Sequence, residues 1–304
     1  NAGGSNMEWT ASADAGWLEV QPDSGSSAGE VDNLSLTYAN STMPVGTYTG
    51  MVTVTYAEGA TSRQVRVVLN IRSQGSYMLD FDGDGSSDLG VYYPPGGNWY
   101  AFRTSLGFWQ TQFGYAGTVP VVGDFEGDGR ADIGCYYAPG GNWYQFRSSN
   151  GFWQTQFGYA GTLPVVGDFD GDGKSDIGCF YPAGGNWYQY RSGSGFWETN
   201  GVGYAGTLPV VGDFDGDGLA DIGYYDPPRG KWYLVQSSDG VRNETFGYAG
   251  TTPVVGDFDG DGKADIGCYY PPGGNWYYFG SQRGFVSDQF GYAGTLPLGG
   301  STSP

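Results

Sequence analysis

The chain has 304 residues, of which 39% are hydrophobic, and a formal net charge of −19. Its length suggests two domains, or one repeat array with an additional domain, and it can bury a substantial core. The 13 Lys and Arg residues form no run, which argues against a nucleic-acid partner. No segment is apolar over the length that a membrane helix needs, so we expect no membrane insertion.

The chain contains no histidine. This excludes a histidine-dependent catalytic triad, a histidine zinc site and a histidine general base. The carboxylates offer no unrepeated pair in a recognisable motif for acid–base chemistry. We therefore expect a protein that is not an enzyme and has no catalytic residues.

Glycine and aromatic residues dominate the composition, with 57 Gly, 10 Trp, 25 Tyr and 17 Phe. This combination is typical of many short strands joined by tight turns. Helix signals are nearly absent, so the sequence predicts an all-β protein.

Residues 1–72 carry no internal repeat and have the pattern of an alternating β domain. In Met51–Tyr56 apolar residues alternate with threonine, which predicts a half-buried strand of a β-sandwich. The expected strands, separated by Gly, Ser or Pro turns, are Met7–Ala11, Trp17–Gln21, Asp32–Tyr38, Tyr48–Tyr56 and Arg63–Ile71.

Four segments of this region resemble the BACON-type immunoglobulin-like domain of secreted bacterial proteins, namely Trp9–Ser12, Gly16–Pro22, Ser24–Gly25 and Gly46–Gly50. The resemblance implies an Ig-like β-sandwich over residues 1–72. Domains of that family have one or two strands before the first of these segments, so we expect the sandwich to lack a strand. Either preceding sequence has been removed, or another chain, including a second copy of this one, supplies the strand by β-augmentation.

After a short polar linker at residues 73–76, residues 77–304 contain five repeats. Their acidic loops begin at residues 80, 124, 168, 213 and 257, so the spacing is 44 residues except for one of 45. This period indicates the four-stranded blades of a β-propeller. In the third repeat we expect strands at Leu163–Gly167, Ile177–Tyr181, Trp187–Arg191 and Phe196–Tyr204. Its extra residue falls near Asn200–Gly201, where a bulge would absorb it.

The sequence alone does not decide how the first and last repeats join to close the ring of blades. The inner-strand pattern occurs six times, because Tyr77–Leu79 and Leu296–Leu298 flank the five repeats. A closed ring of five blades has room for only one of these two segments as an inner strand.

Each repeat contains a nine-residue acidic loop, and the five loops together hold 20 of the 32 Asp and Glu residues. Four carboxylates in one short loop would repel one another strongly unless a cation lay between them. Calcium fits because it takes about six to eight oxygen ligands in flexible geometry, whereas magnesium demands a tighter octahedron. We expect about five Ca²⁺ ions, one per repeat, which would offset about half of the net charge.

The expected side-chain ligands are the carboxylates at loop positions one, three, five and nine. By repeat, these are Asp80, Asp82, Asp84 and Asp88; Asp124, Glu126, Asp128 and Asp132; Asp168, Asp170, Asp172 and Asp176; Asp213, Asp215, Asp217 and Asp221; and Asp257, Asp259, Asp261 and Asp265. Glu126 stands where the other loops have aspartate, and its longer side chain predicts the weakest site.

The loop pattern Asp-x-Asp-x-Asp-Gly-x-x-Asp, preceded by Pro-Val-Val-Gly and followed by Ile-Gly, resembles the VCBS and FG-GAP repeats of extracellular calcium-binding β-propellers. Segments such as Phe113–Gly117 keep the Phe-Gly of FG-GAP but lack its Gly-Ala-Pro. The resemblance covers residues 77–300. It implies a further calcium ligand in each loop, the backbone carbonyl at position seven, which belongs to Ser86, Arg130, Lys174, Leu219 and Lys263.

Positions that are identical in all five repeats are expected to be required by the blade. One such set, which we expect to pack between blades, is Trp99, Trp143, Trp187, Trp232 and Trp276. Three repeats also share a cysteine in one slot, and equivalent points of neighbouring blades lie too far apart for disulfides. We expect Cys135, Cys179 and Cys268 to be small buried residues.

A second set of residues occurs in only three repeats and consists of Trp109, Trp153, Trp197, Arg103, Arg147 and Arg191. The tryptophans correspond to Arg242 and Val286 in the other repeats, so this position should be at least partly exposed. Arg beside an exposed aromatic ring suits sugar stacking or a protein interface. Recent duplication with drift in the last two repeats explains the pattern equally well.

Three function classes follow from these features. The first is a non-enzymatic, secreted or cell-surface bacterial protein, in which a calcium-stabilised propeller serves adhesion or extracellular assembly, including a filament joined by strand donation. The second is a carbohydrate-binding lectin. The third is the non-catalytic part of a polysaccharide-degrading enzyme. The expected partner is accordingly a glycan or another protein chain, including a second copy bound through the N-terminal domain.

Overall fold

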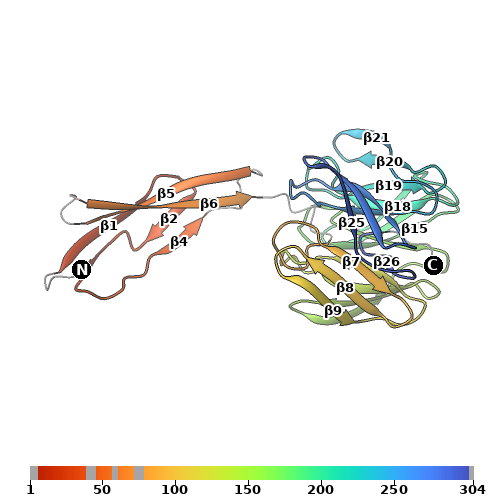
Figure 1. Ribbon diagram of the computed structural model, residues 1–304, viewed down its shortest axis with the longest axis horizontal. Coiled ribbons are helices and arrows are strands. Elements are labelled where there is room, and N and C mark those ends of the chain that lie inside the picture. Colours follow the sequence, from red (N-terminus) through yellow and green to blue (C-terminus); the bar gives the residue numbers. More distant parts are fainter. Residues whose placement is uncertain (1–5, 39–45, 57–60, 72–78, 301–304) are drawn as a thin grey trace. The chain divides into compact units, whose positions relative to one another are not determined.

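The computed structural model describes residues 6–38, 46–56, 61–71 and 79–300. Two compact units divide the chain, Asn1–Arg72 and Ser73–Pro304. Every regular element in the described ranges is a β-strand (Figure 1), which confirms the all-β prediction. The predicted linker at residues 73–76 lies outside them. A search of the same ranges finds no helix that could span a membrane.

The first unit has two sheets that pack on one core. Its strands are β1 (Met7–Ala13), β2 (Leu18–Gln21), β3 (Ser24–Ser27), β4 (Ser35–Tyr38), β5 (Gly46–Tyr56) and β6 (Thr61–Ile71). One sheet has the order β3-β1-β5-β6, and the other pairs β2 with β4. The core consists of Trp9, Ala11, Leu18, Val20 and Val52. The inward side chains alternate along β1 and β2, as a half-buried strand requires.

Strand β3 was not predicted, because Ser24–Ser27 has no hydrophobic alternation. Its packing depends on a close approach instead: a Cβ at Gly25 would lie 2.5 Å from the Trp9 ring. Strand β4 begins at Ser35 rather than at Asp32, whose carboxylate accepts a hydrogen bond from Trp9 Nε1 at 2.8 Å. Trp9 thus contacts both Gly25 and Asp32 and holds these two segments against the core.

The smaller sheet of this unit leaves apolar side chains exposed. All four side chains of β4 are exposed, with Leu36 at 41% and Tyr38 at 53%. On β6 of the larger sheet, Val65 is 58% exposed. The described residues of this unit form one sheet of four strands and one of two, and the strand expected to be missing before Trp9–Ser12 stays a prediction.

The second unit contains five four-stranded sheets, here called blades 1 to 5 (Figure 1). Blade 1 comprises β26 (Leu296–Pro297), β7 (Leu89–Tyr93), β8 (Asn98–Arg103) and β9 (Gly107–Gln112). Blade 2 comprises β10 (Val119–Gly123), β11 (Asp132–Tyr137), β12 (Asn142–Arg147) and β13 (Gly151–Gln156). Blade 3 comprises β14 (Leu163–Gly167), β15 (Asp176–Tyr181), β16 (Asn186–Arg191) and β17 (Gly195–Asn200).

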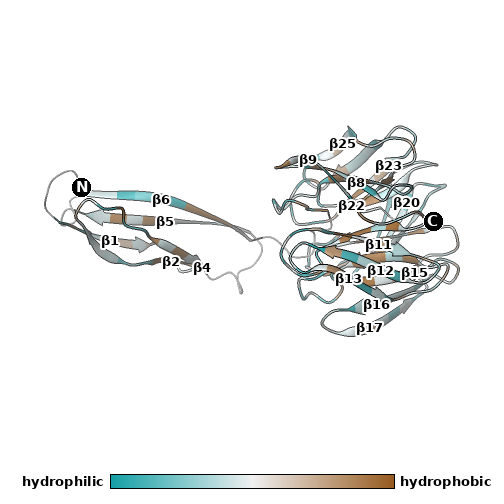
Figure 2. Cartoon of the chain, turned by 90° about the horizontal axis from the view of Figure 1, so that it is seen from below, coloured by the Kyte–Doolittle hydropathy of each residue, from teal (hydrophilic) through white to brown (hydrophobic). Residues whose placement is uncertain are grey.

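Blade 4 comprises β18 (Leu208–Gly212), β19 (Asp221–Asp226), β20 (Lys231–Gln236) and β21 (Gly240–Thr245). Blade 5 comprises β22 (Thr252–Gly256), β23 (Asp265–Tyr270), β24 (Asn275–Gly280) and β25 (Gly284–Gln289). Within each blade all neighbouring strands are antiparallel, which gives the propeller-like sheets that the period predicts. Figure 2 shows more hydrophobic residues on β11, the second strand of blade 2, than on β17, the outer strand of blade 3.

The C-terminal segment takes the inner position of blade 1. Leu296 and Pro297 pair with Tyr92 and Val91 of β7. Leu298 N donates to Gly90 O at 2.8 Å, and Gly300 forms a bridge with Val254 of blade 5. The segment therefore joins the first blade to the last. Of the competing segment, Tyr77 and Met78 lie outside the described residues, and Leu79 is fully buried.

The outer strand of blade 3 ends at Asn200, not at Tyr204 as predicted. The N–H groups of Gly201 and Val202 both donate to Gly185 O, at 3.0 and 3.2 Å, whereas other blades use one N–H at this place, such as that of Phe113 to Gly97 O. The extra residue of the third repeat is accommodated in this bulge, in agreement with the sequence.

The five tryptophans shared by all repeats are at most 1% exposed, which confirms that they belong to the core. Each indole N–H donates to a backbone carbonyl just after the outer strand, as Trp143 Nε1 does to Phe157 O at 2.8 Å. The ring also packs on an aromatic ring of the second strand, Tyr136 in blade 2. The three cysteines are buried free thiols, and burial raises the pKa of Cys135 to about 11.

Candidate metal centres

Each acidic loop connects the inner strand of its blade to the second strand. In blade 1 the glycines at loop positions four and six, Gly83 and Gly85, have φ of 77° and 85°, a conformation that favours glycine. The turn folds the loop back on its own first residue. Asp80 Oδ1 accepts the N–H of Gly83, and Oδ2 that of Gly85, both at 2.7 Å. The same bonds recur in all five loops.

The last aspartate of each loop ties the loop to the hairpin between the third and fourth strands. In blade 1, Asp88 Oδ2 accepts the N–H of Phe81 at 2.9 Å, and Oδ1 accepts that of Thr104 at 2.7 Å. Asp132, Asp176, Asp221 and Asp265 repeat this arrangement. The loop is therefore held from both sides before any ion is considered.

The aspartate at position three leaves one oxygen without a partner. Asp82 Oδ2 accepts the N–H groups of Ser105 and Leu106, each at 3.0 Å. Its Oδ1 is buried and forms no hydrogen bond within the described residues, and the same holds for the Oδ1 atoms of Asp170 and Asp259. Asp82 as a whole is only 8% exposed. A buried carboxylate oxygen without a donor is costly, and a bound cation would satisfy it.

Carboxylates at positions one, three and nine come together in four of the loops. In each group, one oxygen from each residue lies within 4.8 Å of the others, a separation that suits shared ligation of one ion. The groups are Asp80, Asp82 and Asp88; Asp168, Asp170 and Asp176; Asp213, Asp215 and Asp221; and Asp257, Asp259 and Asp265. Four of the five repeats thus each have an aspartate cluster that can hold a metal ion.

The predicted ligand at position five lies outside these groups of three. In blade 1 the Asp84 carboxylate accepts the N–H of Ser86 at 2.9 Å and the hydroxyl of Thr104 at 2.6 Å. The equivalent residues of the other blades bond in the same way to a serine hydroxyl. The sequence could not anticipate this, because the serine or threonine stands about twenty residues later.

Burial and mutual repulsion raise the pKa values of the clustered carboxyls. Burial, only partly offset by backbone N–H donors and reinforced by a neighbouring carboxylate, raises the pKa of Asp88 to about 6 and that of Asp265 to about 7. Asp82 differs: burial raises its pKa, but the Ser105 hydroxyl and the N–H donors of the hairpin outweigh this and hold the pKa below its usual value. A cation would relieve the repulsion and favour the charged forms.

The second loop forms no such group of three within the part of the chain that the structure describes. Its Glu126 reaches the hairpin instead, where Oε1 accepts the hydroxyl of Ser148 at 2.7 Å and Oε2 accepts the amide of Asn150 at 2.8 Å. The carboxylate oxygens of Glu126, Asp124 and Asp132 therefore do not all come within 4.8 Å of one another. That this site is the weakest stays a prediction, and this geometry agrees with it.

The five loops are linked to one another around the unit. In each loop the backbone carbonyl of the first residue accepts an N–H from the next loop, as Asp80 O does from Ala131 at 2.7 Å. The chain of bonds closes because Ser87 N donates to Asp257 O at 2.8 Å. An ion that stiffens one loop would therefore stiffen its contact with the next blade.

The tryptophans found in three repeats are partly exposed, as predicted: Trp197 is 53% exposed, and Trp109 and Trp153 are half-buried. In blades 2 and 3 the arginine stacks on the tryptophan of its own blade. The guanidinium of Arg147 lies 4.7 Å from the Trp153 ring centre, and that of Arg191 lies 4.8 Å from Trp197.

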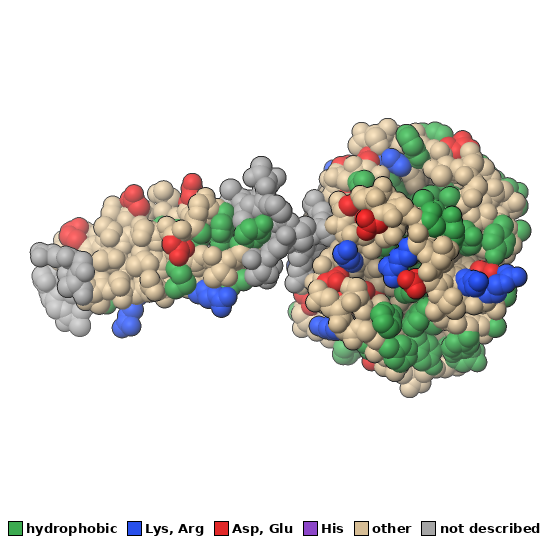
Figure 3. Space-filling model, turned by 90° about the horizontal axis from the view of Figure 1, so that it is seen from above, with side chains coloured by type: hydrophobic (Ala, Val, Ile, Leu, Met, Phe, Trp, Pro, Cys, Tyr) green, Lys and Arg blue, Asp and Glu red, His purple; other side chains and the backbone are tan. Residues whose placement is uncertain are grey.

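The sequence missed why these arginines are retained. Arg147 donates through Nε and Nη2 to Oε1 of the fully buried Gln145, at 2.9 and 2.8 Å. In blade 1 the glutamine is replaced by Ala101, and Arg103 donates weakly to Gly107 O at 3.4 Å. Arginine and tryptophan thus support the blade, and their use as a ligand or partner surface stays a prediction. Figure 3 shows that charged and hydrophobic side chains are interspersed on one face of this unit.

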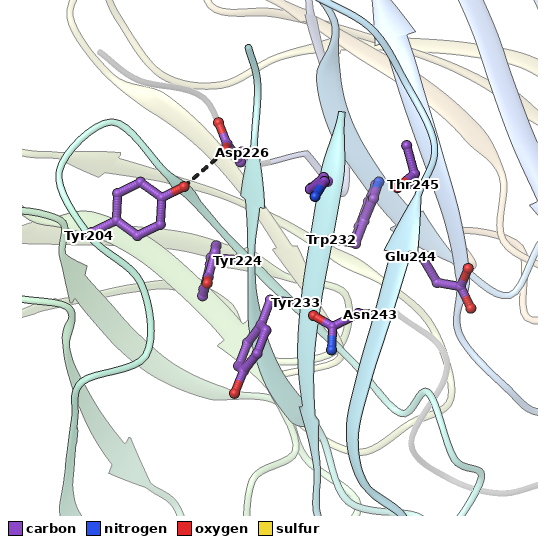
Figure 4. A pocket seen from close by; sticks show the side chains of 9 residues that line it. Tyr204, Tyr224, Asp226, Trp232, Tyr233, Asn243, Glu244 and Thr245 are labelled. Atoms are coloured by element: carbon purple, nitrogen blue, oxygen red, sulfur yellow. Dashed lines mark hydrogen bonds between the residues drawn. The ribbon is translucent and has the colours of Figure 1, made fainter. Parts of the chain in front are cut away.

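Sequence reasoning also missed a pocket in blade 4. It has a volume of about 450 Å³ and is lined by Tyr204, Tyr224, Asp226, Lys231, Trp232, Tyr233, Asn243, Glu244 and Thr245 (Figure 4). A comparison of the repeats could have singled out this blade, because Asp226 stands where the other four blades have tyrosine. Only the structure shows that the residues in which blade 4 differs from the other blades line one pocket.

Comparison with known proteins extends these findings. A catalytically inactive virginiamycin B lyase from Staphylococcus aureus is 10% identical, with a TM-score of 0.40 over 79% of this chain and 80% of that chain. An Agrocybe aegerita lectin that recognises non-reducing terminal N-acetylglucosamine is 18% identical, with a TM-score of 0.39 over 69% and 63%. A Bacteroides thetaiotaomicron protein of unknown function is 13% identical, with a TM-score of 0.40 over 90% and 78%. The comparison with curated proteins gave no match. Residues 168–224 match the family model of the FG-GAP-like repeat, so this part of the chain is similar to that repeat, as predicted.

Proposed function

We propose that the second unit is a five-bladed propeller stabilised by calcium, with one site in each acidic loop. The observation that carries this proposal is the unpartnered, buried Oδ1 of the position-three aspartate in three of the loops, where it belongs to a group of three carboxylates. Three buried carboxylates without a cation would destabilise the loop that they form. Calcium suits them better than magnesium, because it accepts irregular oxygen ligand sets.

The ions have a structural role in this proposal. The carboxylates at positions one and nine each accept two or more backbone N–H bonds, so the loop is already shaped around the site. On binding, the position-five carboxylate would leave the hydroxyl of the hairpin, and the carbonyl at position seven would complete the ligand set. Few positions would remain for a substrate, so we assign the ions no catalytic step.

The resulting molecule is a non-enzymatic scaffold for adhesion or assembly outside the cell. Loops of this kind in extracellular modules bind calcium at about 0.1–1 mM, which suits a secreted or cell-surface location. The first unit would be an Ig-like, BACON-like sandwich whose incomplete smaller sheet accepts a strand from another chain. The exposed Leu36 and Tyr38 of strand β4, which pairs only with β2 among the described residues, support that part of the proposal.

Counting bound calcium tests the central claim. The full chain is stripped with a chelator, dialysed against calcium buffers and analysed for bound metal by mass spectrometry. We expect four ions at low calcium and a fifth only at higher concentration, because Glu126 weakens the second site. A chain that retains no calcium at millimolar concentrations would contradict the proposal, and equal retention of magnesium would contradict the choice of ion.

A further inference from the structure

We propose that blade 4 carries a saccharide-binding pocket between Tyr204 and the outer face of strands β19, β20 and β21. This proposal goes beyond the scaffold function and does not depend on it. The metal loop precedes β19, whereas the pocket surrounds the hairpin that follows it, so the two lie at opposite ends of that strand. One blade, not all five, would then recognise a ligand.

The pocket is formed by side chains that share one face of the blade. The strand register places Tyr224 opposite Tyr233 and Asn243 opposite Tyr233 on the other side. Side chains two positions further along each strand point to the same face. These are Asp226, Lys231 and Thr245, which also lie opposite one another in the register.

The other blades fill this face with a different set of residues. In blade 2 the six equivalent positions hold Cys135, Tyr137, Tyr144, Asn142, Gln154 and Gln156. There Tyr115, in the segment that connects β9 to β10, packs on two tyrosines. Its ring centre lies 5.6 Å from that of Tyr137 and 6.1 Å from that of Tyr144. Blades 1, 3 and 5 have the same cluster of three tyrosines. Blade 4 retains only Tyr233 of these six residues.

The loss of one tyrosine places a carboxylate in the wall of the pocket. Asp226 is 5% exposed, and its Oδ2 accepts the hydroxyl of Tyr204 at 2.9 Å and Nη1 of Arg229 at 2.6 Å. Figure 4 shows the Tyr204 hydroxyl directed at this carboxylate. Its Oδ1 has no hydrogen-bond donor among the described residues. The Asp226 carboxylate is fixed in position through Oδ2, so its Oδ1 can accept a hydrogen bond from a ligand hydroxyl.

The pocket also lacks a clasp, a glutamine side chain hydrogen-bonded to the hairpin, that is present in blades 1, 2 and 5. Gln112, Gln156 and Gln289 each donate from Nε2 to the carbonyl of the hairpin, at 2.7, 2.8 and 3.0 Å. In blade 4 this position is Thr245, whose shorter side chain forms no such bond in the described structure. The hairpin edge of blade 4 is therefore free of the glutamine side chain that covers it in blades 1, 2 and 5.

These features fit a sugar unit better than other small ligands. Tyr224 and Tyr233 are stacked, with ring centres 5.1 Å apart, and offer an aromatic wall to the apolar face of a sugar ring. Asp226 and Asn243 supply acceptors and a donor for its hydroxyls. Both carboxylates of the lining are already paired, Asp226 with Arg229 and Glu244 with Arg242, so a cationic ligand is disfavoured. Lys231 lines the same pocket and offers a further donor to a sugar hydroxyl. The volume of about 450 Å³ lies in the range of small-molecule sites.

The test measures sugar binding by the full chain in excess calcium. The probes are the methyl glycosides of glucose, galactose, mannose and fucose, with N-acetylglucosamine and glucuronate, and the readout is calorimetry or ligand-observed NMR. We expect at least one sugar to bind saturably. Asp226→Asn, which keeps the shape but removes the charge, should weaken binding by about tenfold or more.

Two further variants separate the pocket from the fold. Asp226→Tyr restores the residue of the other four blades, so it should fold and abolish binding. Tyr270→Phe changes the equivalent position of blade 5 and should bind as the wild type does. The proposal is overturned if no probe binds, or if Asp226→Tyr binds as well as the wild type. Bound calcium is measured in the same samples, so a failure of this proposal is distinguishable from a failure of the calcium proposal.

Discussion

The two ends of the blades differ in how strictly they repeat. At the loop end, five acidic loops share nearly the same residues and the same hydrogen bonds. At the hairpin end, blades 1, 2, 3 and 5 share one cluster of three tyrosines, whereas blade 4 arranges its tyrosines differently and has Asp226 in a pocket. Residues that repeat everywhere thus belong to the scaffold, and the single departure is where we expect specific recognition.

The reason lies in the number of partners that each side chain has. Asp124 accepts three N–H bonds of its own loop through its side chain, and one from Ser175 of the next loop through its backbone. A change there disturbs two blades. Tyr137 contacts the ring of Tyr115, so a change at its position disturbs a local cluster. The following predictions test this contrast, from the largest expected effect to the smallest.

Removal of calcium should have the largest effect. A site held at about a hundred times its Kd contributes about 2.7 kcal/mol, and for a unit of this size each such site should raise the Tm by about 5–10 °C. Thermal unfolding is followed by the fluorescence of the buried tryptophans, with excess calcium and with excess chelator. An unchanged Tm would show that calcium does not stabilise the acidic loops, so metal binding would not explain why their sequences are so similar.

Exchanging the position-three residues should move a site from one blade to another. Asp170→Glu gives the third loop the side chain of the second, and we expect one fewer ion at limiting calcium. Glu126→Asp should add one, because the shorter carboxylate can join Asp124 and Asp132. A calcium titration against a chromophoric chelator measures both. If neither variant alters the ion count, side-chain length does not explain the difference between these loops.

The metal-free protein should lose stability as the pH rises. Burial raises the folded-state pKa of Asp176, Asp213, Asp221 and Asp257 to about 6, from an ordinary value of 3.8. A folded-state pKa above the unfolded value contributes stability that is complete below pH 3.8 and is lost as the pH rises through about 6. Unfolding by urea in chelator should therefore show lower stability at neutral pH than at mildly acidic pH.

Calcium supplies the control for this pH dependence. It binds the deprotonated carboxylates, so its stabilising effect should grow over the same pH range in which the metal-free protein weakens. A metal-free protein whose stability rises towards neutral pH would contradict the assignment of these carboxyls as buried and uncompensated.

The clasp at the hairpin end should have the smallest effect. Gln156→Thr removes the hydrogen bond from Nε2 to Gly140 O, which is exposed, so we expect a loss of about 1 kcal/mol or less. Thr245→Gln offers the missing clasp to blade 4 and should stabilise it by a similar or smaller amount. Both are measured by urea unfolding in calcium. A loss of several kcal/mol in Gln156→Thr would mean that the hairpin end is as constrained as the loop end.

The sequence alone determined the features that repeat. Five copies of one loop revealed the period, the four-stranded units and the candidate metal ligands, because each copy must satisfy the same local geometry. The five buried tryptophans were recognisable for the same reason. The bulge at Gly201 also followed from one extra residue in an otherwise constant period.

Only the tertiary structure decided the features that depend on contacts between distant residues. The pairing of Leu296 with Tyr92 settles which segment forms the inner strand of blade 1, across about two-thirds of the chain. The bond from Thr104 to Asp84 removes position five from the group of clustered carboxylates. Asp226 becomes part of a pocket because Tyr204, from the preceding linker, meets it in space. A repeat fixes what each unit contains, but the contacts between units depend on how the chain brings them together.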